Sequence, residues 1–244
     1  KDNRAGTFDG SGRLVIKDPL EASPLDFDNG DAITLEAWVS TRAIGEGDNV
    51  YLIGKGRTNN KSFAVNNQNY ALRLRGQGGE GCVSFLFFSR LEDDKPGDWH
   101  RWTSNTGVLP DDGWSHVAVT YEFGKPKSVK GFVDGKPVSG KWDMGGATER
   151  PPVVDDDELW IGSALGGSRN NSFAGGLDEV VVHREVLSPE IIARRHRRVP
   201  QPKPKYVRDD WPTDKVLVEL VEGFSPARGW PSPDLPPVDS YQQD

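Results

Sequence analysis

The sequence predicts an all-β protein built as a sandwich of two antiparallel sheets. Glycine and proline supply 28 and 18 of the 244 residues, well above the roughly 12% that the two contribute to an average protein. Short apolar runs recur along the chain with turn residues between them, as in proteins with many short strands. Only one short helical pattern interrupts the series. These features favour two packed sheets over a helical bundle or a parallel α/β sheet.

Residues 32–42 carry the clearest strand pattern. Ile33, Leu35 and Val39 alternate with polar or aromatic residues, which predicts one half-buried strand. Residues 83–88 are apolar on both faces, so we expect them in the middle of a sheet. The other predicted strands are, in chain order, 13–17, 50–55, 70–75, 82–90, 101–108, 114–122, 129–134, 158–163 and 176–183.

Two further local signals are specific. Asp134 and Gly135 form a two-residue turn sequence between apolar pairs, because both central positions of such a turn favour positive φ. Ser188 and Pro189 predict a helix start, with a capping hydroxyl followed by a proline that needs no N–H partner. The basic run 194–198 then fits the helix C-terminus, where cations meet the negative end of the dipole.

The composition changes near residue 199, which divides the chain into a sandwich over 1–198 and a proline-rich tail over 199–244. The tail holds nine of the 18 prolines and too little apolar sequence for a core of its own. Either the tail packs on the sandwich through Trp211, Trp230 and the apolar run 216–221, or it links to a further domain.

Composition excludes several classes of function. The net charge of −7 is opposite to that of a typical nucleic-acid-binding domain. No apolar stretch is long enough to span a membrane. The single cysteine, Cys82, rules out an intrachain disulfide and a cysteine-based zinc cluster; burial on an apolar strand would leave its thiol inert.

The ordered set of segments resembles the LamG-like jelly-roll family of the concanavalin A-like lectin/glucanase superfamily. The resemblance covers residues 5 to about 196 and rests on the segments 8–14, 33–39, 53–56, 70–74, 113–121, 132–136, 159–162, 173–180 and 187–191. It implies a concanavalin A-like, two-sheet jelly roll with a short C-terminal helix. It also implies an extracellular module of a larger bacterial protein, secreted, periplasmic or on the cell surface. The fold hosts lectins, glycosidases and interaction modules alike.

The residues argue against catalysis. Retaining glycosidases of this superfamily carry the pattern Glu-x-Asp-x-x-Glu on one strand, and the sequence contains no instance of it. Glu36 with Glu179 is the one weak candidate for a carboxylate pair drawn from different strands. We therefore expect a non-catalytic binding module whose partner is a polysaccharide or other glycan, with a protein-interaction module as the alternative and a glycosidase as the least favoured.

Aromatic residues beside polar loops are the candidate ligand-binding groups. Trp99 and Trp102 follow a polar loop and lie three apart, on opposite faces of a strand, so at most one of them can belong to the core. Trp142 is the third candidate. Each could instead pack in the core or beneath the tail, and a sugar site needs an exposed aromatic platform with polar neighbours.

A structural calcium ion is the one cofactor that the resemblance implies. It would lie where the first strand meets the last, held by Asp178 and by carbonyl groups near residues 8–10. Oxygen-rich loops at 26–31 and 155–158 are alternatives, because Ca²⁺ takes six to eight oxygen ligands. Acidic residues also favour ordinary turns, which is the competing interpretation of these loops.

Overall fold

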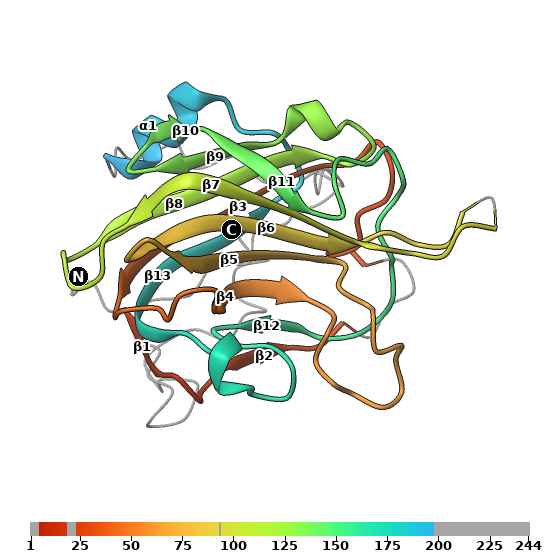
Figure 1. Ribbon diagram of the computed structural model, residues 1–244, viewed down its shortest axis with the longest axis horizontal. Coiled ribbons are helices and arrows are strands. Elements are labelled where there is room, and N and C mark those ends of the chain that lie inside the picture. Colours follow the sequence, from red (N-terminus) through yellow and green to blue (C-terminus); the bar gives the residue numbers. More distant parts are fainter. Residues whose placement is uncertain (1–4, 19–22, 93, 198–244) are drawn as a thin grey trace, which may run out of the picture.

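The computed structural model describes residues 5–18, 23–92 and 94–197; the proline-rich tail and its predicted anchors lie outside these residues. Two antiparallel sheets form the predicted sandwich (Figure 1). The six-stranded sheet has the order β1 (Gly6–Asp9), β13 (Ala174–His183), β3 (Ala32–Thr41), β8 (Ser115–Glu122), β9 (Lys130–Val133) and β10 (Lys136–Val138). The seven-stranded sheet has the order β11 (Gly140–Met144), β7 (Trp99–Val108), β6 (Glu80–Phe88), β5 (Tyr70–Gln77), β4 (Asn49–Lys55), β12 (Leu159–Ile161) and β2 (Leu14–Ile16).

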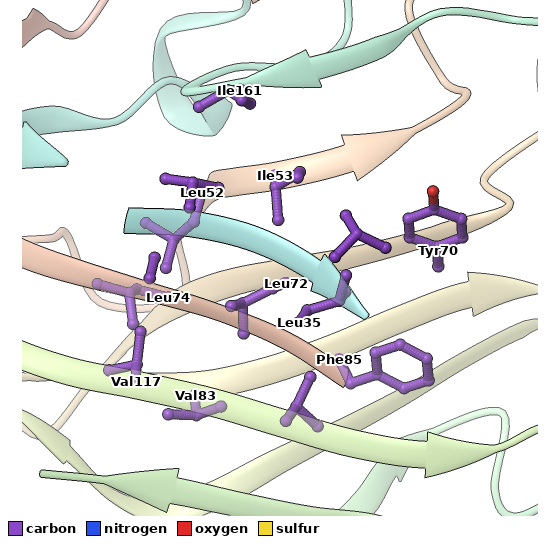
Figure 2. Close-up of a cluster of buried hydrophobic side chains, with 14 of the residues drawn as sticks. Leu35, Leu52, Ile53, Tyr70, Leu72, Leu74, Val83, Phe85, Val117 and Ile161 are labelled. Atoms are coloured by element: carbon purple, nitrogen blue, oxygen red, sulfur yellow. The ribbon is translucent and has the colours of Figure 1, made fainter. Parts of the chain in front are cut away.

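The core lies between the two sheets. Leu35 on β3 and Val117 on β8 meet Leu72 on β5 and Phe85 on β6, and all four side chains are fully buried (Figure 2). Along β5 and β6 every second residue points into this layer, so the intervening residues form the outer face of the seven-stranded sheet. The position of β6 between β5 and β7 confirms the central strand predicted from its apolar sequence.

Strand β3 differs from the prediction in one respect. Its burial extends to both faces rather than one, and even Glu36 and Trp38 on the outer face are almost completely enclosed. Helix α1 (Pro189–His196) explains the difference, because His196 stacks on Trp38 and Arg195 pairs with Glu36. The alternation that predicts a half-buried strand cannot reveal a cover supplied 150 residues further along the chain.

Turns and caps follow the local signals. Asp134 and Gly135 have φ of 49° and 72°, and they connect β9 to β10 as predicted. The Ser188 hydroxyl accepts a hydrogen bond from the Ile191 N–H and Pro189 begins α1. Two short 3₁₀ turns, η1 (Pro126–Ser128) and η2 (Arg169–Asn171), complete the elements.

Strands β1 and β11 have no counterpart among the predicted strands. Each is short and carries turn-forming or charged residues, so neither shows a periodic apolar run. In the described part of the chain no helix has the length and apolar character needed to cross a bilayer.

Candidate functional site

The three candidate tryptophans lie in different environments. Trp102 is 4% exposed and belongs to the core, where its ring fills the space left by Gly131 and Gly140. Trp142 is half-buried, packs edge-on against Phe87 and donates its indole N–H to the Pro126 carbonyl at 3.2 Å. Both side chains therefore serve the sandwich, and neither offers a platform on the surface.

Trp99 alone of the three points to the outer face of the seven-stranded sheet. It is partly exposed and meets Phe88 edge-on at a centroid distance of 5.0 Å. The Arg57 guanidinium carbon lies 4.5 Å from the centre of its ring, a cation–π arrangement. The expectation that Trp99 and Trp102 lie on opposite strand faces agrees with this placement.

Arg57 is also tied to β4, the strand that it follows. Its Nη1 donates to the Tyr51 hydroxyl at 2.8 Å, and that hydroxyl in turn donates to Oε1 of Gln68 at 2.8 Å. Gln68 is held by the carbonyl groups of Lys55 and Tyr70. The guanidinium is thus oriented by a buried chain of hydrogen bonds.

A second arginine, Arg73, lies on the same face in the middle of β5. It is 3% exposed, and its Nη2 donates to the Ser84 hydroxyl at 3.0 Å while its Nε has no hydrogen-bond partner. Its guanidinium lies 5.4 Å from the Tyr51 ring. Burial lowers the pKa of Arg73 to about 10, because the charged form loses its hydration.

Further cations belong to this face. Cross-strand pairing places Lys141 of β11 beside Thr103, and alternation places Arg75 beyond Arg73 on β5. Arg101 on β7 forms a bidentate ion pair with Asp143, at 2.7 Å from Nε and 3.2 Å from Nη2.

We call the set Tyr51, Arg57, Arg73, Arg75, Ser84, Trp99, Arg101, Thr103, Lys141 and Asp143 the arginine face. Five members are cationic and one, Asp143, is a carboxylate. Glu80 of β6 lies on the same outer face toward its Arg75 end, so the excess positive charge is concentrated around Arg57 and Arg73, on a molecule whose net charge is −7.

A cavity of about 250 Å³ adjoins the arginine face at Arg57, two residues after β4 ends. Arg57, Lys61 and the side chains of the 59–67 loop line it, with Leu165 on the far side. Arg57, Asn59 and Leu165 have φ of 58°, 69° and 52°, a left-handed conformation that costs non-glycine residues of order 1 kcal/mol or more. The lining contains two cations and no carboxylate among the residues that the structure describes.

A buried polar network holds this loop in place. Lys55 is fully buried, and its Nζ lies among the Asp18 carboxylate at 2.8 Å, the Asp26 carboxylate and the Asp155 carbonyl. Asn69 contributes a further oxygen at 3.3 Å. Burial raises the pKa of Asp26, although the Lys55 hydrogen bond opposes that shift. The ammonium occupies the centre of an oxygen cage.

The two acidic loops proposed as alternative calcium sites converge on this lysine. Asp26 comes from the first loop and Asp155 from the second. Asp157 accepts hydrogen bonds from Thr58 at 2.6 Å and from Asn67 at 2.9 Å. The Asp26 carboxylate and the Asp155 carbonyl already contact the Lys55 ammonium, and Asp157 accepts from neutral donors, so all three act as internal partners of the protein.

Asp178, the first calcium candidate, is 6% exposed on β13 beside a β-bulge, and its Oδ1 accepts the Glu179 N–H at 2.9 Å. Phe8 pairs with Gly175, so the expected carbonyl ligands lie about 10 Å along β13 from Asp178 at 3.3 Å per residue. Within the described ranges no three His, Cys, Asp or Glu residues gather as metal ligands. Calcium binding at Asp178 stays a prediction.

Glu36 is committed to internal contacts. Its carboxylate accepts from His116 Nε2 at 3.1 Å and from His183 Nε2 at 2.9 Å, and it pairs with Arg195. Burial alone would raise the pKa of Glu36, but these hydrogen bonds and charges hold it well below the usual range. Glu179 lies at the bulge of β13 with φ of 46°.

The comparisons with known proteins agree with this architecture. Residues 12–193 match the family described as the concanavalin A-like lectin/glucanases superfamily. The chain belongs to the concanavalin A-like lectin/glucanase superfamily. Among curated proteins, none matches the sequence of this superfamily member.

Solved structures resemble this superfamily member in fold. The binding module CBM40 of the Ruminococcus gnavus IT-sialidase, bound to α2,3-sialyllactose, has a TM-score of 0.52 at 15% identity, over 79% of this chain and 96% of that one. A Bacteroides ovatus protein provisionally described as carbohydrate-binding has a TM-score of 0.50 at 18% identity, over 80% of this chain. This chain spans 47% of that protein's length.

The binding domain of Paraclostridial Mosquitocidal Protein 1 has a TM-score of 0.53 at 14% identity, over 75% of this chain and 40% of that one. At such identities the likeness establishes the jelly-roll fold of this superfamily member. This likeness does not show which ligand the chain binds.

Sequence reasoning did not select Arg57 or Arg73. The signal for Arg73 is present, because Tyr70, Leu72 and Leu74 alternate with Ala71, Arg73 and Arg75. Such alternation assigns arginines to an outer face, where they ordinarily meet solvent or carboxylates. Their gathering depends on the order β4, β5, β6 and β7 in the sheet, which the superfamily's segment order does not specify.

Proposed function

We propose that the chain is a non-catalytic carbohydrate-binding module, and that a glycan lies on the arginine face beside Trp99 and Arg57. The observation that carries the proposal is the partly exposed Trp99, fixed by Phe88 and by Arg57, the residue that also lines the neighbouring cavity. Sugar sites combine an aromatic surface with a few oriented polar groups. Here Arg57, Asn59 and Lys61 supply those groups.

The commitment of Glu36 supports a non-catalytic role. Glycoside hydrolysis needs two carboxyl groups across one bond, one of them protonated. Glu36 is held ionised and enclosed by two histidines and Arg195. Asp143, the carboxylate of the arginine face, is engaged by Arg101.

The fold likeness to carbohydrate-binding domains supports an extracellular or cell-surface location as part of the same proposal. One of those domains belongs to an IT-sialidase. This chain covers 96% of the CBM40 domain but only 47% of the longer Bacteroides ovatus protein. Both coverages fit a module within a larger secreted protein.

Affinity electrophoresis tests the proposal. The wild-type chain is run through gels that contain neutral and acidic plant, algal or bacterial polysaccharides, beside Trp99→Ala and Trp114→Ala. Trp114 is the matched control, because it is 43% exposed and packs over Gly176 of the six-stranded sheet. We expect Trp99→Ala to weaken binding at least about tenfold, as for a central aromatic contact, and Trp114→Ala to leave it unchanged.

Two results would contradict the proposal. The first is a wild-type chain that no polysaccharide retards. The second is equal retardation of the wild type and Trp99→Ala, which would place a glycan elsewhere.

A further inference from the structure

The arginine face contains cations that no carboxylate compensates. Among the described residues, neither Arg57 nor Arg73 takes part in any ion pair, whereas Arg101 is neutralised by Asp143. An exposed arginine without a partner is ordinary. Arg73 is not exposed: 97% of it is removed from solvent, and one of its N–H groups donates to nothing.

An unpaired buried cation is unfavourable for the free protein. Removing a guanidinium from water costs free energy unless an anion or a full set of acceptors replaces the hydration. Elsewhere this protein follows the rule. The buried Lys55 has Asp18 and Asp26, and Arg195 has the buried Glu36. Among the described residues, Arg73 therefore differs from Lys55, the other buried cation, which has carboxylate partners.

The groups around Arg73 do not compensate its positive charge. Burial lowers the pKa of Arg73 most, and the cations Arg101 and Arg57 lower it further, whereas Tyr51 opposes the shift. The polar contacts that favour it come from the Tyr51 ring and the Ser84 hydroxyl, which are neutral. Three guanidinium groups and one carboxylate therefore share the middle of the face, with Lys61 across the adjoining cavity.

We propose that the arginine face recognises an anionic glycan, one that carries carboxylate or sulfate groups, with Arg57 as the contact residue and Arg73 as the buried charge behind it. This inference rests on the proposed carbohydrate-binding function and names the ligand class of the same site. The anion meets the remaining N–H groups of Arg57 beside Trp99. Its charge also compensates Arg73, which the protein itself leaves unpaired.

The geometry suits a planar or multidentate anion. A guanidinium offers several N–H donors in a fixed fork, which matches two oxygens of one acidic group. Arg57 uses Nη1 for Tyr51 and lies against Trp99, so its orientation is set before a ligand arrives. The face opposes the negative charge of the whole molecule, and so it attracts acidic polymers that the rest of the surface repels.

Isothermal titration calorimetry at low salt tests the inference with polygalacturonate, a sialylated oligosaccharide, dextran sulfate and neutral dextran. We expect at least one acidic ligand to bind, at least about tenfold more tightly than dextran, and to weaken as salt screens the charges. Comparison of the three acidic ligands shows whether the anionic group is a carboxylate or a sulfate. Arg57→Gln is expected to reduce acidic binding at least about tenfold. Lys127→Gln removes the same charge from the exposed η1 turn and is expected to change nothing.

The variant Arg73→Met tests whether the charge of Arg73 serves ligand binding or the stability of the fold. If Arg73 is retained for an anion, the variant melts at the same temperature as the wild type or higher, and it binds the acidic ligand more weakly. A lower melting temperature with wild-type affinity would overturn this role, because Arg73 would then stabilise the fold alone.

The two proposals fail in different ways. Binding of neutral dextran as tightly as the acidic ligands, lost in Trp99→Ala but kept in Arg57→Gln, would overturn the anionic ligand and leave the carbohydrate module in place. Absence of binding to all four ligands and to the polysaccharide panel would overturn both.

Discussion

Several charged side chains are buried inside this sandwich, and that of Lys55 is fully buried. Its ammonium meets two carboxylates and a carbonyl group while its whole side chain is buried. The partners come from two segments that are far apart in the sequence, residues 18–26 and Asp155. The acidic loops are therefore held by a lysine at the end of β4, and the loop that lines the cavity starts from the same point.

Replacing Lys55 with methionine is expected to lower the free energy of unfolding by about 3–5 kcal/mol, because Asp18 and Asp26 would remain buried without a cation. Urea denaturation followed by tryptophan fluorescence measures the change. Lys61→Met serves as the control, since Lys61 is exposed in the neighbouring loop. A loss of less than about 1 kcal/mol in Lys55→Met would show that the cage does not depend on its cation.

At the scale of elements, Glu36 joins strands β3, β8 and β13 to helix α1. His116, His183 and Arg195 reach it from three different elements. Ser188 and Pro189 predict α1 from the sequence. The arginines that follow them suggest, on sequence grounds, only an interaction with the helix dipole. In the structure one of them, Arg195, fixes the helix to the outer face of β3.

The pKa of Glu36 gives this contact a pH dependence. Its folded-state pKa lies below the ordinary value of 4.5, so the contribution is complete above that value and declines as the pH falls toward the folded-state pKa. We expect the wild type to lose stability between pH 6 and pH 3 more steeply than Glu36→Gln. The variant should also be about 3–5 kcal/mol less stable at pH 7.

Urea midpoints at several pH values measure both effects. Glu149→Gln, an exposed glutamate replaced in the same way, provides the control and should match the wild type. Parallel pH profiles for the wild type and Glu36→Gln would show that Glu36 does not stabilise the helix contact.

At the scale of the whole molecule, the first and last strands pair at one edge of the six-stranded sheet. Phe8 on β1 is 1% exposed, lies edge-on to Phe173 at 6.3 Å and covers Gly162, where a Cβ atom would come within 2.4 Å of its ring. Phe8→Ala should therefore cost about 3–5 kcal/mol in urea denaturation. Thr7→Ala, exposed on the same strand, should cost little; equal effects would mean that β1 is dispensable to the core.

Prediction from the sequence succeeds where neighbours in the chain decide the outcome. The alternation in β3 and β5, the Asp134 turn and the Ser188 cap are local, and their strands, turn and helix follow. The core position of Trp102 and the surface position of Trp99 depend on which sheet face is enclosed, so alternation separates them without saying which is which. The pairing state of Arg73 depends on side chains from three strands, beyond any local pattern.

The place of β3 within its sheet has a consequence for biosynthesis. The strand is complete once residue 41 has been made, but its two partners are β8 at 115–122 and β13 at 174–183. One hydrogen-bonding edge of this apolar strand therefore stays open until residue 122 has been made, and the other until β13 completes the sheet near the end of the sandwich. Open edges of this kind invite pairing with other chains, so we expect the growing polypeptide to be most prone to mispairing before β13 has been made.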